Sequence, residues 1–221
     1  MSYFQASTER LRPTRLMAIL HRPWVDRTIA VAASLPFVVE LYDRWIGGHL
    51  SFPRAVLGVQ ILILIVTMLF RTAPVRVTPN PLFWLLAFVV SYGTLAFPAF
   101  AQRGVPLVPP LESNGLALVS AGILIYARLS LGRSIGFVPA QRQIVTAGAY
   151  RYVRHPIYTG AFVALLALVL HAYSLLNLAW ASAIVALFMV KSVIEEWFLR
   201  HDPEYAAYLA RVRWRWFPGI A

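Results

Sequence analysis

The residues best suited to chemistry lie in two short segments that are far apart in the sequence. The first, residues 148–160, combines arginines, a histidine and tyrosines with glycines that let a ligand approach the backbone closely. The second, residues 191–197, places Lys191 four positions before Glu195, so that both share one helix face, with Glu196 next to them. Carboxylates that end an apolar helix are costly unless they are paired or exposed, which makes them candidates for a functional site.

Pro156 organises the first segment. A proline restricts the residue before it, His155, to extended geometry and fits the start of a helix at Ile157. The free N–H groups at that helix start could receive a ligand carboxylate. A mixture of arginine and tyrosine is also typical of a belt that anchors a helix at lipid headgroups. The Lys191–Glu195 spacing likewise also fits a simple ion pair beside a solvated Glu196.

A third polar segment follows. Asp202 is a good N-cap and Pro203 suits the first helical position, so a helix is expected to begin here. Tyr205, Tyr208 and Val212 fall on one stripe of this helix. The pattern predicts a short amphipathic helix that lies either on the membrane or over the first polar segment.

The overall composition excludes a soluble, disordered or fibrous protein. Of the 221 residues, 59% are hydrophobic and 13% are charged, where soluble domains have about 25% charged residues. The mean hydropathy is +0.65. The absence of cysteine excludes disulfides, thiol nucleophiles and cysteine-bound metals. The net charge of +11 is expected to face anionic lipid and not nucleic acid.

The apolar stretches predict an all-α fold, a polytopic membrane helix bundle of about five to six spans. Residues 1–27 form a basic N-terminal tail, residues 28–131 four transmembrane helices, and residues 132–221 the region that carries the chemistry. A last apolar block, residues 161–190, is too long for one span, and residues 173–177 are expected to turn it into a helical hairpin. The four earlier spans are expected at residues 28–45, 55–70, 82–101 and 116–131.

Charge placement predicts the orientation of the bundle. With six spans, most basic residues lie on the side of the N-terminus, and the opposite loops hold only Arg44, Arg54 and Arg103. The positive-inside rule then makes both termini cytoplasmic. The polar segments before the hairpin and after it consequently meet at the cytoplasmic face.

The polar segments together resemble the isoprenylcysteine carboxyl methyltransferase family, in particular its smaller bacterial members. The family pattern is Gly-x-Tyr-x-x-x-Arg-His-Pro-x-Tyr-x-Gly, an apolar helix pair, a Glu-Glu pair, and a Tyr-x-x-Tyr tail that ends near a proline. The similarity covers roughly residues 128–219. The matching residues are Gly148, Tyr150, Arg154, His155, Pro156, Tyr158 and Gly160, then Glu195 and Glu196, then Tyr205, Tyr208 and Pro218.

The resemblance implies an integral membrane methyltransferase that uses S-adenosyl-L-methionine, needs no metal, and releases S-adenosylhomocysteine. It implies a bacterial inner membrane more than an endoplasmic reticulum. Lys191 stands where the eukaryotic enzyme has a substrate-contacting arginine, and lysine keeps the charge but loses the bidentate fork. The expected catalytic residues are Lys191, Arg154 and Glu196. The expected cofactor-binding residues are Gln143, Ile144, Val145, Tyr150, His155, Pro156, Tyr158 and Glu195.

Each expected role has a chemical reason. Glu195 would pair with the cofactor's ammonium, and Arg154 or the helix start after Pro156 would take its carboxylate. Tyr150 and Tyr158 offer rings to the adenine or the sulfonium. A charged nucleophile could be steered by Lys191 or Arg154, whereas an amine would need Glu196 or His155 as a base.

Three other interpretations remain open at this stage. The same fold could methylate a phospholipid amine or a small lipophilic thiol instead of an isoprenylcysteine carboxylate. A sterol-type reductase would bind a nicotinamide dinucleotide, and a lipid-binding protein would bind no cofactor. In every case the partners are the lipid bilayer and a lipophilic or lipidated molecule, with no nucleic acid.

Overall fold

The computed structural model describes residues 23–48, 52–72, 76–78, 80–100, 104–135, 140–141 and 143–220. This part of the chain is mostly helical, which confirms the predicted all-α membrane bundle. Most of the predicted N-terminal tail lies outside it. The long helices are α3 (Pro23–Ile46), α4 (Phe52–Leu69), α5 (Pro81–Phe100), α6 (Pro110–Leu131), α7 (Pro156–His171) and α8 (Leu175–Leu199). The short elements are β1 (Arg76–Val77), the 3₁₀ turn η1 (Gly132–Ser134), β2 (Ala140–Gln141), the 3₁₀ turn η2 (Gly148–Arg151) and α9 (Pro203–Arg211).

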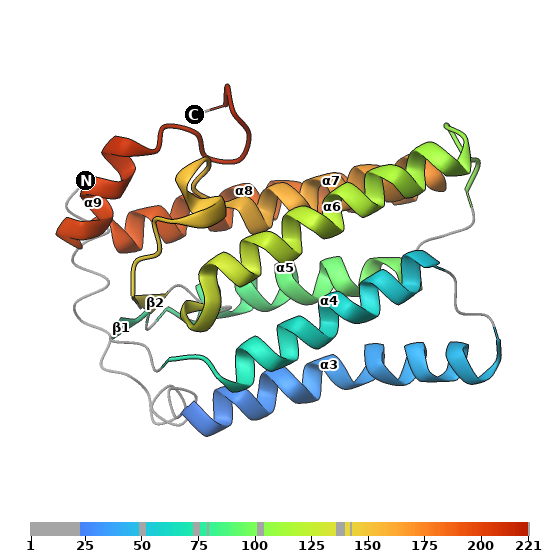
Figure 1. The fold of residues 1–221 in the computed structure, drawn as a ribbon, viewed down its shortest axis with the longest axis horizontal. Coiled ribbons are helices and arrows are strands. Elements are labelled where there is room, and N and C mark those ends of the chain that lie inside the picture. The colour runs from blue at the N-terminus through green and yellow to red at the C-terminus, as the bar shows by residue number, and fades with distance from the viewer. Residues whose placement is uncertain are drawn as a thin grey trace.

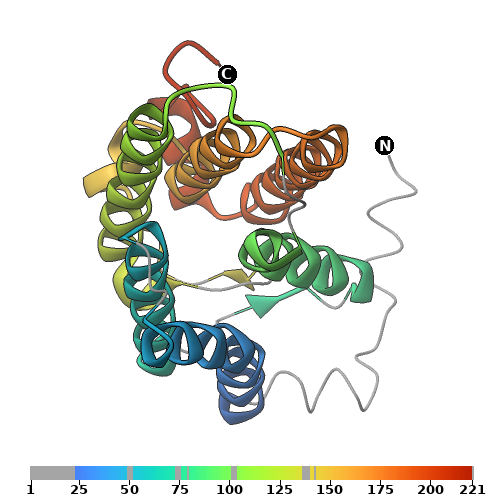
Figure 2. The same ribbon diagram turned by 90° about the vertical axis from the view of Figure 1, so that its right-hand side faces the viewer.

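The long helices form a closed ring. Viewed end-on in Figure 2, they follow one another in the order α3, α4, α6, α7, α8 and α5, and each packs against the next. The loop with η2, the start of α7, the end of α8 and α9 all lie at one end of the bundle, on the left in Figure 1, which we call the site end. Segments that are distant in the sequence therefore meet there.

Local sequence signals account for where the helices start. Pro156 and Pro203 occupy the first position of α7 and α9, where a missing N–H costs nothing. Asp202 caps α9 as predicted, accepting hydrogen bonds from Glu204 N at 2.8 Å and from Tyr205 N at 3.4 Å. Ser174 caps α8 by accepting from Asn177 N at 3.1 Å. The apolar block of residues 161–190 consequently turns at the predicted place and forms the α7–α8 hairpin.

Two of the long helices are both long and apolar enough to cross a membrane, judged over the described residues. These spans are Pro110–Ser134 and Leu175–Leu199, and Pro81–Ser91 and Pro156–His171 are shorter apolar helices. Large apolar side chains also stay exposed along the outside of the ring, among them Leu82, Leu111 and Leu129. An apolar exterior of this kind fits a lipid environment.

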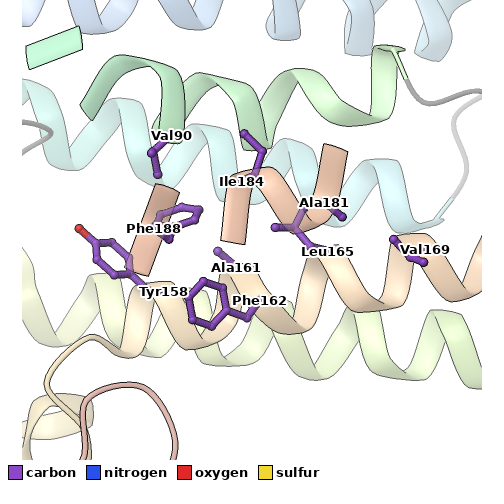
Figure 3. Close-up of a cluster of buried hydrophobic side chains, with 9 residues drawn as sticks. All are labelled: Val90, Tyr158, Ala161, Phe162, Leu165, Val169, Ala181, Ile184 and Phe188. Atoms are coloured by element: carbon purple, nitrogen blue, oxygen red, sulfur yellow. The ribbon is translucent and has the colours of Figure 1, made fainter. Parts of the chain in front are cut away.

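The core lies between α5, α7 and α8 and reaches the site end. Its buried residues include Val90 of α5, Phe162 of α7 and Phe188 of α8, and Tyr158 lies at the edge of the group in Figure 3. Helices α6 and α7 approach closely because Gly160 has no side chain. A Cβ atom there would lie 2.6 Å from Leu124 Cγ. Because α7 begins only four residues before Gly160, this contact fixes the position of the site.

A two-residue antiparallel ladder at the site end was not predicted. Arg76 pairs with Gln141 and Val77 with Ala140. Nearby, Thr72 N donates to Arg133 O at 2.8 Å. A ladder this short has no alternating pattern to reveal it, and it joins the chain after α4 to the chain before η2.

Candidate active site

The loop before α7 is held against α6 by Gly148. This glycine has φ +60°, and a Cβ atom on it would clash with Ser130 Oγ, so the position requires glycine. Ala149 N donates to the same hydroxyl at 3.1 Å. The loop therefore presents its side chains from a fixed base on the end of α6.

His155 lies just outside α7, but its backbone is not extended as predicted. Its ψ of 62° turns the carbonyl towards the helix, where it accepts from Tyr158 N at 3.0 Å and from Thr159 N at 3.1 Å. These two hydrogen bonds satisfy N–H groups of the first turn of α7. Fewer N–H groups are then left for a ligand than the sequence suggested.

Glu195 belongs to a compact hydrogen-bonded group with Lys191 and Tyr158. Lys191 Nζ lies 2.7 Å from Glu195 Oε1, and Tyr158 OH donates to Glu195 Oε2 at 2.6 Å. Lys191 Nζ also donates to Tyr158 OH. Lys191 is only 4% exposed, so its charge depends on this carboxylate. The predicted Lys191–Glu195 pair is confirmed, and it recruits a tyrosine from α7.

Glu196 has two arginines as its cationic partners and is not solvated. Arg215 binds it through both donors of its fork, Nε to Oε1 at 3.0 Å and Nη2 to Oε2 at 3.0 Å. Arg154 Nη1 lies 3.3 Å from Oε2, and His155 Nε2 lies 3.1 Å from Oε1. We call these four residues the Glu196 clamp. The hydrogen bonds to Glu196 raise the pKa of Arg215 above its usual value.

His155 connects the two carboxylates. While Nε2 contacts Glu196, Nδ1 lies 3.8 Å from Glu195 Oε2. The ring also stacks on Tyr158, with centroids 5.1 Å apart and an interplanar angle of 6°. The orientation of this imidazole is therefore set by the two carboxylates at the end of α8.

The chain after α9, residues 212–220, forms what we call the C-terminal strap. Its backbone pairs with the loop before α7: Arg154 N donates to Trp214 O at 2.9 Å, and His155 N donates to Arg215 O at 2.9 Å. Thr159 Oγ1 donates to Trp216 O. The rings of Trp216 and Phe217 pack against Phe162. Tryptophans in such a tail are typical of a lipid anchor. In the structure the tail instead packs on the start of α7.

Helix α9 lies over the polar loop, which is one of its two predicted positions. Tyr208 OH donates to Tyr150 O at 2.8 Å, and Ile144 and Tyr150 pack against the cluster of Tyr205, Tyr208 and Val212. Burial, followed by the nearby Tyr208 and Glu195, raises the pKa of Tyr150 far above its ordinary value. Its phenol therefore stays protonated and can donate a hydrogen bond.

The structure brings most of the predicted site residues together. Tyr150, His155, Pro156, Tyr158 and Glu195 converge with Lys191, Arg154 and Glu196 at the site end. Ile144 joins them through α9. Gln143 is exposed and Val145 is half-buried, and no contact described in the structure connects either of them to Glu195.

Sequence reasoning missed the contribution of Arg215. It lies in the run Arg213-Trp214-Arg215-Trp216, which is typical of a membrane-surface anchor. Its spacing from Glu196 carries no helical signal, because the two residues are separated by α9. The one sequence signal for this pair is indirect: the tail is rich in arginine, and Glu196 ends an apolar helix and needs a cationic partner.

Comparison with known proteins bears on the same region. Residues 115–204 match the profile of a family described as phospholipid methyltransferase, which supports a membrane methyltransferase family. The matched residues contain most of α6, all of α7 and α8, and both carboxylates. The cytochrome c biogenesis proteins CcsA of Synechococcus sp. and Guillardia theta are 35% and 32% identical over 46% of this chain. This chain spans about a third of the length of these relatives.

Proposed function

We propose that this protein is an integral membrane methyltransferase that transfers a methyl group from S-adenosyl-L-methionine to a lipophilic acceptor. The observation that carries the proposal is Glu195, a carboxylate at the end of an apolar helix, hydrogen-bonded by Tyr158 and Lys191 beside the ring of His155. The profile match over residues 115–204 supports the same reaction class over a reductase or a lipid-binding protein. Residues 132–221 would form the catalytic region.

The donor set suits the proposed cofactor. Its ammonium needs a carboxylate, and the side chain of Glu195 is 18% exposed, so it can still be reached by a ligand. Its adenine and sulfonium favour aromatic neighbours, and Tyr150, His155 and Tyr158 lie around this carboxylate. Once bound, the cofactor supplies an electrophilic methyl group, so the protein itself needs to provide alignment and no metal.

The two proposed roles of Glu195 and Lys191 are coupled. Lys191 is the counter-ion of Glu195 in the structure, so an ammonium ligand would have to share this carboxylate with it. Sharing would loosen Lys191 and let it attract an anionic acceptor at the same site. Lys191 therefore remains a candidate catalytic residue in this proposal.

The proposed roles of Arg154 and Glu196 receive less support. The oxygens of Glu196 accept from Arg154, Arg215 and His155, which leaves little capacity for a substrate proton. If the acceptor is an amine, His155 is the better base, because its Nδ1 has only the longer 3.8 Å approach to Glu195. We therefore propose Glu196 as a positioning residue for His155.

A phospholipid amine is a second candidate acceptor beside an isoprenylcysteine carboxylate. The description of the matched family favours it. One assay distinguishes the two acceptors. Protein in vesicles is incubated with methyl-labelled cofactor and with either phosphatidylethanolamine or an acetylated farnesylcysteine, and the labelled product is identified. Label in the phospholipid would assign an amine acceptor, and label in the farnesylcysteine would assign a carboxylate.

The first test is calorimetric titration of the detergent-purified protein with S-adenosylhomocysteine. We expect saturable binding near one molecule per chain, with a strong loss of affinity in Glu195→Gln. Glu204→Gln is the matched control, because it removes the same charge from an exposed position in α9. A folded, monodisperse protein that binds no S-adenosylhomocysteine would refute the proposed function.

A further inference from the structure

The cofactor of the proposed function carries a carboxylate next to its ammonium, so the site needs a cation besides Glu195. Arg154 or the helix start after Pro156 was expected to bind this carboxylate. Two N–H groups of that helix start, those of Tyr158 and Thr159, are already bonded to His155 O. Each nitrogen of Arg154 also has an acceptor in the protein. Nε donates to Val212 O at 2.7 Å and Nη2 donates to Leu209 O at 3.1 Å. Nη1 donates to Glu196 at 3.3 Å. Arg154 is therefore committed to holding α9 and the C-terminal strap.

The other cations of the site are also engaged. Lys191 is shared between Glu195 and Tyr158, and in the proposed function it is left for the methyl acceptor. Arg215 binds Glu196 through its fork. If Arg215 left Glu196 to bind a ligand, the Glu196 clamp would lose two hydrogen bonds. The position of His155, which contacts the same carboxylate, would then be less fixed. A carboxylate ligand thus needs a cation outside both groups.

Arg128 is such a cation. It lies in the last turn of α6 and is 9% exposed. Its Nη1 donates to the backbone carbonyl of Gln60 in α4 at 2.9 Å, and it forms no ion pair with any residue that the structure describes. A buried guanidinium inside a membrane helix is costly, and where it occurs it usually serves a function.

Helix packing brings Arg128 level with the start of α7. Helices α6 and α7 run in opposite directions (Figure 1), and Ser120 Oγ donates to Gly160 O at 2.8 Å. Leu124 faces the same glycine. One further turn along α6 reaches Arg128, and one turn back along α7 reaches Pro156, because both helices rise about 1.5 Å per residue. Arg128 consequently lies at the depth of the first turn of α7.

Tyr150 links this cation to the carboxylate of the site. The negative charge of Glu195 raises the pKa of Tyr150 and the positive charge of Arg128 lowers it, although burial is the largest cause of its shift. Geometry agrees with this link: Ala149 N donates to Ser130 Oγ, two residues after Arg128, so Tyr150 follows a residue held at this end of α6. An α-amino acid carries an ammonium and a carboxylate on a single carbon, and such a pair of opposite charges suits it.

We propose that Arg128 binds the α-carboxylate of the cofactor while Glu195 binds its ammonium. This assignment makes a residue of the membrane bundle part of the cofactor site. It also leaves Arg154 and Arg215 free to keep the C-terminal strap in place.

Two ligands test the assignment, because it rests on the proposed function and has to be separated from it. S-adenosylhomocysteine carries the amino acid group, whereas 5′-methylthioadenosine keeps the adenosine and the sulfur but lacks it. The quantity to measure is the ratio of their affinities in calorimetric titrations. In Arg128→Gln we expect the affinity for S-adenosylhomocysteine to fall about 10- to 100-fold, the usual effect of losing a charged hydrogen bond, and that for 5′-methylthioadenosine to be unchanged.

Further variants keep the test decisive. Arg128→Lys retains the charge and should lower the ratio only a few-fold, which is informative even if Arg128→Gln fails to fold. Arg133→Gln is the matched control, because Arg133 is an exposed arginine just after the same helix and should change neither affinity. An unchanged ratio in both Arg128 variants, or an equal loss for both ligands, would overturn the assignment. A wild-type protein that binds neither ligand would instead refute the proposed function as well.

Discussion

Glu195 and Glu196 are neighbours in the sequence, yet the two faces at the end of α8 treat them differently. Glu195 faces Tyr158 of α7 and has one cation, Lys191, at hydrogen-bond distance. Glu196 faces the loop before α7 and the C-terminal strap, from which Arg154 and Arg215 bind it. Successive residues of a helix point about 100° apart, so adjacent carboxylates can enter different environments. The comparison shows one carboxylate with a single cation at hydrogen-bond distance, and another that holds distant segments together.

The largest effect is expected from Glu196→Ala. Removing this carboxylate leaves Arg154 and Arg215 close together without their shared counter-ion, which is expected to lower the free energy of unfolding by about 3–5 kcal/mol. Denaturant unfolding in detergent, followed by tryptophan fluorescence, measures the loss. Glu204→Ala, at an exposed position of α9, is the control and should change stability little. A similar small loss in both variants would contradict the structural role of Glu196.

Replacing each carboxylate with Gln tests the difference between Glu195 and Glu196. Glu195→Gln is expected to weaken S-adenosylhomocysteine binding about 10- to 100-fold, because a charged hydrogen bond to the ligand ammonium is lost. Glu196→Gln is expected to lower the free energy of unfolding clearly and to change the affinity for S-adenosylhomocysteine little. Titration and unfolding of both variants form a two-by-two comparison. Equal effects of the two substitutions on affinity would remove the distinction between the faces.

A smaller effect is expected from Arg215→Gln. Arg154 still neutralises Glu196 in this variant, so the loss of the Arg215 fork is expected to cost about 1–3 kcal/mol of stability. His155 should also become less ordered, which NMR of the imidazole protons can detect. Arg213→Gln removes an exposed arginine two residues away and is the control. If the control has the same effect, charge near the membrane and not the clamp is responsible.

The smallest expected effect is that of Tyr208→Phe. The variant loses the hydrogen bond to Tyr150 O and keeps the packing of the ring, for an expected cost of about 1 kcal/mol. Hydrogen exchange of the loop around Tyr150 should increase. Tyr205→Phe is its control, since the hydroxyl of Tyr205 donates to no residue that the structure describes. Equal protection of the loop in both variants would argue against α9 as its anchor.

Much of the fold was predictable because helix starts, caps and turns are local features. Pro156 and Pro203 mark two helix starts, Asp202 caps α9, and the turn after residue 172 divides the last apolar block. The pairing of Lys191 with Glu195 was predictable for the same reason, since four residues make one helical turn. These signals need no knowledge of the rest of the chain.

The clamp and the strap were not predictable in this way. Arg154, Glu196 and Arg215 come from a loop, a helix end and a tail, and no sequence spacing relates them. The sequence left a solvated Glu196 open as one interpretation for the same reason, because the residues that bury it come from elsewhere in the chain. The closeness of Arg128 to the start of α7 depends on the contact of Gly160 with Leu124, which is a property of helix packing.

The sequence by itself therefore determined a membrane bundle of helices, the hairpin of α7 and α8, and most of the polar residues that meet at the site end. Composition, apolar length and capping are properties of neighbouring residues, and they act before the chain has folded. The tertiary structure alone decided which carboxylate meets which cation. Hydrogen bonds act over about 3 Å, and only the packed helices and the strap bring such distant residues within that range.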